Sequence, residues 1–294
     1  MPNGRLDRLT WVVRPENLEN YVKSANDAFG VEFEFYDGPR YGAYPKGAGI
    51  RSFVSWEGGL EFIAPLDARD PITQQYRDFL DTHGEGFYGF VFGVDDLRAA
   101  VTRARKAGFD LSEATPGSPL GDQREQLQKW TTRVTSCEQR PLGEVLGTHI
   151  TLAHVVYTGA KNPLPRIDHF IWVAQAENVE RYVHLLSELL GVRFDHYDGP
   201  SYETNAFGIH TYMSWDAGLE VVAPLGDGDQ VASHFQAFLA ESGEAPYGFV
   251  LGVDNLSAAC DRARRAGFDV SALLQTPDTR IAPIVAAPVD VESG

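Results

Sequence analysis

Arg166-Ile167-Asp168-His169-Phe170-Ile171-Trp172-Val173-Ala174 decides the fold of this chain, because the chain contains the stretch twice. The first copy is Arg5-Leu6-Asp7-Arg8-Leu9-Thr10-Trp11-Val12-Val13, with Arg8 in the place of His169. Both copies read as a buried strand, and the segments that follow them are also repeated. The chain can therefore be interpreted by comparing two copies of one unit.

The repeat extends over most of the chain. The matched segments are 36–39 with 197–200, 55–61 with 214–220, 88–91 with 247–250, and 105–110 with 264–269. Residues 159–165, which contain Gly159, Pro163 and Pro165, separate the copies. We predict a first domain at residues 1–158, a linker at 159–165 and a second domain at 166–294.

Each copy follows the same order of elements. In the first, apolar residues at helical spacing run from Leu18 to Phe29 and end before Gly30, and three short extended segments follow at 31–36, 50–56 and 60–64. A second strand–helix–strand–strand–strand series follows in each copy, although the last one stops before a counterpart of His149–Tyr157. We expect an α+β fold of four βαβββ units, the last one truncated.

Composition narrows the range of partners and compartments. The 294 residues carry a formal net charge of −16, which argues against nucleic acid or an anionic membrane as a partner. No apolar run predicts a membrane span or a secretion signal. The two cysteines, Cys137 and Cys260, are too few for a disulfide framework or a thiolate zinc site. We expect a cytoplasmic protein that binds a small molecule and that could form a homodimer.

Four βαβββ units, with Asp168-His169 on an opening strand and Gly218-Leu219-Glu220 on the fourth strand, resemble the vicinal oxygen chelate superfamily. That superfamily includes glyoxalases, methylmalonyl-CoA epimerases, bleomycin-resistance proteins and extradiol dioxygenases. The resemblance implies that two units pair edge to edge around a cavity, which usually holds a divalent metal. It also implies that ligands come from the first and fourth strands.

The resemblance assigns ligand positions one at a time. On first strands they match Arg8, Gly89, His169 and Gly248, and on fourth strands they match Glu61, approximately Thr151, and Glu220. The first domain is then expected to be degenerate, and the second to hold Fe, Mn or Zn through His169 and Glu220. A glycine at position 248 departs from the histidine that ring-cleaving dioxygenases carry there.

Strand alternation adds residues to the predicted site. If the turn at Asp216-Ala217-Gly218 sets Ser214 opposite Glu220, then His210 and Tyr212 share the face of Glu220. His169, His210 and Glu220 would then make a metal site of two imidazoles and a carboxylate. The alternative is that His210 binds substrate or lines the cavity.

Other polar residues are expected at the cavity wall. His196 on the second strand and Tyr202 after it are candidates for substrate binding. In the first domain Arg8 and Arg51 are expected to pair with Glu61, since arginine cannot ligate a metal. The alternative is that Arg51 or Arg8 receives a substrate carboxylate.

Two classes of function follow from these residues. The first is an enzyme that uses a divalent metal as a Lewis acid toward a carbonyl, enol or catechol-like substrate, with His210, Tyr212 and Glu220 as catalytic residues. The second is a metal-free binding or sequestering protein of the bleomycin-resistance type. An enzyme that uses Tyr212 or His210 as acid or base without a metal lies between them.

Overall fold

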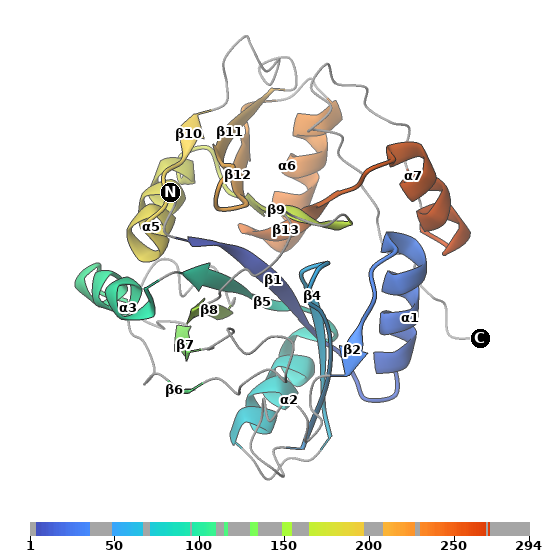
Figure 1. The fold of residues 1–294 in the computed structure, drawn as a ribbon. Helices are drawn as coiled ribbons and strands as arrows, with labels where there is room; N and C mark the ends of the chain where they lie inside the picture. Colours follow the sequence, from blue (N-terminus) through green and yellow to red (C-terminus); the bar gives the residue numbers. More distant parts are fainter. Residues whose placement is uncertain are drawn as a thin grey trace.

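A computed structural model describes residues 4–35, 49–66, 71–94, 96–109, 115–116, 130–134, 149–154, 165–196, 208–226, 230–268 and 270. Within these residues the chain forms one eight-stranded and one five-stranded sheet, each flanked by helices (Figure 1). The expected α+β class with repeated βαβββ units is confirmed. The predicted linker lies almost entirely outside the described residues, so the domain boundaries stay predictions.

The first sheet contains two complete βαβββ units. The first unit is β1 (Gly4–Val12), α1 (Leu18–Phe29), β2 (Glu34–Phe35), β3 (Ile50–Ser55) and β4 (Leu60–Pro65). After α2 (Pro71–His83), the second unit is β5 (Gly86–Val94), α3 (Leu97–Lys106), β6 (Thr115–Pro116), β7 (Trp130–Val134) and β8 (His149–His154). The strand order is β2-β3-β4-β1-β5-β8-β7-β6, so the opening strands β1 and β5 join the two units edge to edge.

The second sheet repeats this arrangement as far as it is described. Its elements are β9 (Arg166–Val173), α5 (Val179–Leu190), β10 (Asp195–His196), β11 (Ile209–Ser214), β12 (Leu219–Pro224), α6 (Gln230–Ser242), β13 (Ala245–Gly252) and α7 (Leu256–Arg265). The strand order is β10-β11-β12-β9-β13, which matches the first five strands of the other sheet. Residues 271–294, where the end of the fourth unit was expected, lie outside the described residues.

The two faces of the second sheet pack against different helices. Trp172 and Val221 belong to the buried cluster that includes Tyr182 of α5. Val173 and Val222 belong to a second cluster, which includes Leu239 of α6. Because neighbouring residues of a strand point to opposite faces, Glu220 shares the α6 face with Val222.

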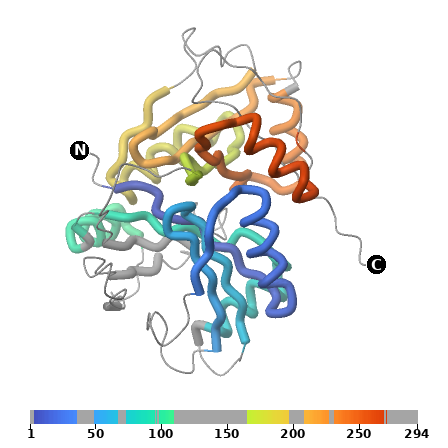
Figure 2. Tube along the Cα trace, turned by 45° about the vertical axis from the view of Figure 1, so that its right-hand side comes forward, coloured from blue at the N-terminus to red at the C-terminus, as the bar shows by residue number. Residues whose placement is uncertain are grey.

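Two matched helix pairs, α3 with α5 and α7 with α1, connect the two domains. Arg103 of α3 donates from Nη2 to the carbonyl of Leu190 at the end of α5, at 2.8 Å. Arg262 of α7 donates in the same way to Phe29 at the end of α1, at 3.3 Å, and Figure 2 shows α7 beside α1. Each receiving helix ends at a glycine with φ of 72°. A side chain on Gly191 would collide with the Arg103 guanidinium, so the glycine also makes room for it.

No helix in the described part of the chain is both long enough and apolar enough to cross a lipid bilayer.

Candidate functional site

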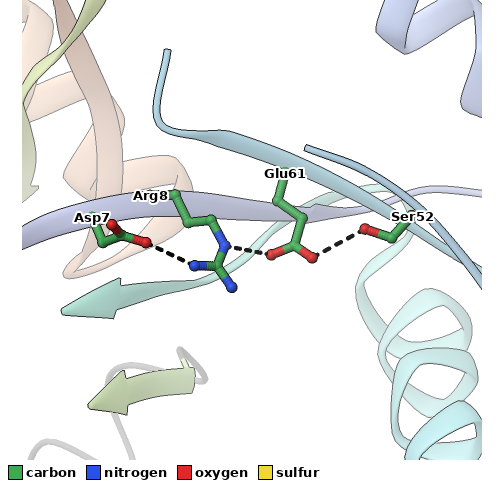
Figure 3. A network of polar contacts seen from close by, with 4 residues as sticks. All are labelled: Asp7, Arg8, Ser52 and Glu61. Carbon is green, nitrogen blue, oxygen red and sulfur yellow. Dashed lines mark hydrogen bonds and ion pairs between the residues drawn. The ribbon is translucent and has the colours of Figure 1, made fainter. Parts of the chain in front are cut away.

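The first domain holds a buried charge network at the position of the opening-strand motif (Figure 3). Arg8 donates from Nε to Glu61 Oε2 at 2.7 Å and from Nη1 to Asp7 Oδ2 at 2.7 Å. Ser52 Oγ donates to the other oxygen of Glu61 at 3.0 Å. Arg8 and Glu61 are only 6% and 2% exposed, so water scarcely reaches the pair.

An aromatic ring completes this network. The guanidinium carbon of Arg8 lies 5.5 Å from the centroid of the Trp56 ring, within range of a cation–π interaction.

The ion pair between Arg8 and Glu61 confirms the predicted pairing of these two residues. The predicted pairing of Arg51 with Glu61 is wrong, because Arg51 pairs with Ala64 across β3 and β4 and so lies on the opposite face.

The second domain places His169 where the first has Arg8. His169 Nδ1 lies 2.8 Å from Asp168 Oδ2, and Nε2 lies 3.1 Å from Glu220 Oε2. The Trp215 ring meets the imidazole edge to face with centroids 5.8 Å apart, whereas the guanidinium of Arg8 lies over the ring of the matched Trp56. The side chain of His169 is 4% exposed, but those of Asp168 and Glu220 are 48% and 18% exposed. The carboxylates of the second domain are therefore more open to solvent than those of the first.

The surroundings of His169 change its protonation. Burial alone would lower the pKa of the imidazole. The hydrogen bonds and charges of Asp168 and Glu220 raise the pKa by a larger amount, so that it reaches about 9. In the metal-free protein the ring is therefore an imidazolium at neutral pH, and both of its N–H groups donate to carboxylates.

The donors at His169 fit a divalent metal. Two atoms that bind one ion at about 2.0–2.1 Å lie about 2.9 Å apart in an octahedral site and about 3.3 Å apart in a tetrahedral one, and Nε2 and Glu220 Oε2 are 3.1 Å apart. Asp168 accepts from Nδ1–H, which is the usual partner of a metal-bound histidine. Within the described residues, no group of three His, Cys, Asp or Glu is arranged to hold an ion. Two protein ligands would leave coordination positions for water or substrate.

The fourth unit contributes a glycine to the face of the sheet that holds this pair. Gly248 of β13 pairs with Ile171, so it lies on the His169 face of the sheet. No heavy atom of the described residues comes within 4 Å of a Cβ built at Gly248. Among the described residues, nothing fills the space in front of this glycine.

The expected convergence of His210 and Tyr212 on this site is wrong. The β11–β12 hairpin closes with the four residues 215–218, so that Ser214 pairs with Leu219 and Met213 pairs with Glu220. This register differs by one residue from the expected one, and a one-residue shift turns every side chain to the other face. Thr211, not His210, shares the face of Glu220, as Ser52 does with Glu61.

The remaining predicted residues fall into two groups. His196 pairs with Tyr212 across β10 and β11, and its Nε2 lies 3.4 Å from His210 Nδ1, so these three gather on the face opposite Glu220. Tyr202 lies outside the described residues. Sequence reasoning did not assign roles to Asp168 and Thr211. The repeated Asp7/Asp168 and the alignment of Ser52 with Thr211 were the signals that could have identified them.

Comparison with known proteins agrees with this architecture. Residues 9–124 match the model of the Glyoxalase/Bleomycin resistance protein/Dioxygenase superfamily. A triple mutant of 4-hydroxymandelate synthase from Streptomyces coelicolor superposes with a TM-score of 0.61 at 17% identity, over 94% of this chain and 78% of that one. None of the curated proteins compared matches the chain.

A second structural neighbour is a fusion of a xylose isomerase-like TIM barrel with 4-hydroxyphenylpyruvate dioxygenase, with a TM-score of 0.54 at 13% identity. The match covers 90% of this chain and 39% of the fusion protein. At such identities these likenesses establish the fold, and chemistry has to be argued from the site.

Proposed function

We propose that this chain, whose residues 9–124 match the model of the glyoxalase/bleomycin resistance protein/dioxygenase superfamily, is a metal-dependent enzyme. Its substrate is a small organic molecule that presents carbonyl, enol or catechol-like oxygens. The proposal rests on one observation: of two repeat-matched positions, only His169 with Glu220 offers an imidazole and a carboxylate at a distance suited to one ion.

His169 Nε2 and Glu220 Oε2 would hold Fe, Mn or Zn. Bound there, the ion would supply Lewis acidity toward the oxygens of the substrate. Asp168 holds the Nδ1–H of His169 and so keeps Nε2 directed at Glu220. Trp215 packs against the imidazole and restricts its rotation.

In this proposal a substrate reaches the pair past Gly248, which has no side chain and lies on the His169 face of the sheet. A substrate oxygen that approaches from β13 would meet no heavy atom of the described residues within 4 Å of the Cβ position at Gly248. The names of the two structural neighbours contain 4-hydroxymandelate and 4-hydroxyphenylpyruvate, both acids with an oxygen on the carbon next to the carboxylate. Two adjacent oxygens of this kind suit an ion that keeps at least two open positions.

Metal analysis of protein purified without oxygen tests the proposal. We expect the wild-type chain to bind one equivalent of Fe²⁺, Mn²⁺ or Zn²⁺ at the His169 site, and His169→Arg to lose that equivalent. The arginine variant is a matched control, because the first domain already accommodates an arginine against a glutamate at this position. A wild-type protein that contains no ion and gains none on titration would exclude the metal-dependent enzyme.

The second candidate is a metal-free protein that binds or sequesters a small molecule. It is favoured by the carboxylate partners that both His169 ring nitrogens already have, an arrangement that is stable without an ion. Catechol binding distinguishes the two candidates. The enzyme requires catechol to bind only after metal is added, whereas equal binding to the metal-free protein and to His169→Arg would favour the binding protein.

A further inference from the structure

A second group of donor side chains lies on the opposite face of the same sheet. His196 comes from the edge strand β10, and His210 and Tyr212 come from β11. His196 is exposed, and the other two are partly exposed. Because these residues share the face of Val221 and not that of Glu220, the group is separate from the His169 pair.

The distance between the two imidazoles suits a shared ion. His196 Nε2 and His210 Nδ1 lie 3.4 Å apart, which is longer than an ordinary N–H···N hydrogen bond. Two nitrogens bound tetrahedrally to one ion at about 2.0–2.1 Å are about 3.3 Å apart. The two nitrogens are thus separated by the distance expected for two ligands of one ion. An ion could bind between them with little movement of either side chain.

The Tyr212 ring orients one of the two imidazoles. It stacks on His196 with ring centroids 4.5 Å apart and planes inclined by 25°. His196 and Tyr212 are also direct cross-strand neighbours, so backbone pairing and stacking both restrict the imidazole. Holding the ring in one orientation lowers the entropy that binding would otherwise cost.

We propose that His196 and His210 form a second metal site, which takes a borderline divalent transition ion such as Cu²⁺ or Zn²⁺. His196 would bind through Nε2 and His210 through Nδ1, with the other ring nitrogens protonated. Imidazole suits these ions, and Cu²⁺ should bind more tightly than Zn²⁺. The exposure of His196 leaves the remaining coordination positions to water or to an external ligand.

The first domain shows that the fold does not need these donors. The matched residues there are Phe35, Arg51 and Phe53, and the two phenylalanine rings pack edge to face at 5.4 Å. The same strand positions are therefore filled without any metal-binding group. His196 and His210 are additions of the second domain, and phenylalanine or arginine in their places copies a packing that the repeat already tolerates.

Titration with Cu²⁺ and Zn²⁺ tests the site in the full chain. All measurements use the His169→Arg background, so the result does not depend on the proposed active site. We expect one equivalent of Cu²⁺ to bind, with electron paramagnetic resonance hyperfine lines from two imidazole nitrogens. His196→Phe and His210→Arg should each weaken binding at least tenfold and remove one nitrogen from the spectrum.

Two controls make the result specific. Tyr212→Phe should bind Cu²⁺ nearly as tightly as its background, since the phenol is not a ligand in this proposal. His184→Ala removes an exposed histidine of α5 and should change nothing. Circular dichroism checks that each variant folds. Affinity within twofold of the background in both His196→Phe and His210→Arg would overturn the proposal.

Discussion

Each domain has one cationic residue between two carboxylates at its opening strand, but the exposure of the carboxylates to solvent differs between the domains. Asp7, Arg8 and Glu61 in the first domain have side chains 11%, 7% and 3% exposed. In the second domain Asp168, His169 and Glu220 are 48%, 4% and 18% exposed. In both, the central cation is buried under a tryptophan and lies between two carboxylates. Only the second leaves its carboxylates accessible.

The difference follows from the chemistry of the central residue. A guanidinium is always charged and has no lone pair to give, so Arg8 can only balance Glu61 and Asp7. An imidazole can lose its proton and then bind an ion through Nε2. One substitution on a shared strand thus separates a structural ion pair from a candidate metal site, and the following predictions test that separation.

The largest effect is expected from Arg8→Ala. It leaves Glu61 buried without a cation, which should cost about 3–5 kcal/mol of unfolding free energy. The matched variant His169→Ala, measured without metal, should cost less, because Glu220 is partly exposed and can be hydrated. Urea unfolding at neutral pH measures both. Equal losses in the two domains would show that the difference in exposure has no energetic consequence.

The stability of the metal-free protein should depend on the charge of His169. Its pKa is raised from 6.5 to about 9 in the folded state, so the folded protein holds the extra proton more tightly than the unfolded chain. The resulting stabilisation is complete below pH 6.5 and is lost as the pH rises through 9. It amounts to at most about 3 kcal/mol.

Urea unfolding at several pH values, in the presence of a chelator, checks this titration. Other groups also ionise in this range, so the informative quantity is the difference between the wild-type chain and His169→Arg. Between pH 7 and pH 10 the free energy of unfolding of the wild-type chain should fall relative to that of His169→Arg. A constant difference would mean that His169 is neutral in the folded protein.

Gly248→His should bring the second domain closer to a complete metal site. A Cβ at this position has no heavy atom of the described residues within 4 Å, and the residue lies on the His169 face of the sheet. An added imidazole should tighten binding of Zn²⁺ about 10- to 100-fold, or about 1.4–2.7 kcal/mol. Competition with a coloured chelator measures the affinity. The gain should vanish in the double variant with His169→Arg, where the original ligand is absent.

Repetition made the fold predictable from the sequence, but side-chain placement was predictable only in part. Matching Arg8 to His169 and Glu61 to Glu220 was sufficient to foresee the ion pair of the first domain, because a buried glutamate requires a cation beside it. His210 was assigned to the wrong face because the hairpin has a four-residue loop, and register depends on loop closure. The stacking of His196 on Tyr212 depends on how β10 pairs with β11, and the long segment 197–208 between these strands does not fix that register.

The smallest predicted effect concerns the matched arginines that join the domains. Arg103 caps α5 with a hydrogen bond of 2.8 Å, whereas Arg262 caps α1 with one of 3.3 Å. Loss of the shorter bond in Arg103→Gln should cost about 1 kcal/mol, and Arg262→Gln should cost about half of that. Thermal unfolding of both variants and of the double variant measures the two contributions. Because the two arginines lie at opposite ends of the domain interface, their effects should add. A loss in the double variant much larger than the sum of the two single losses would mean that the two arginines depend on each other in holding the domains together.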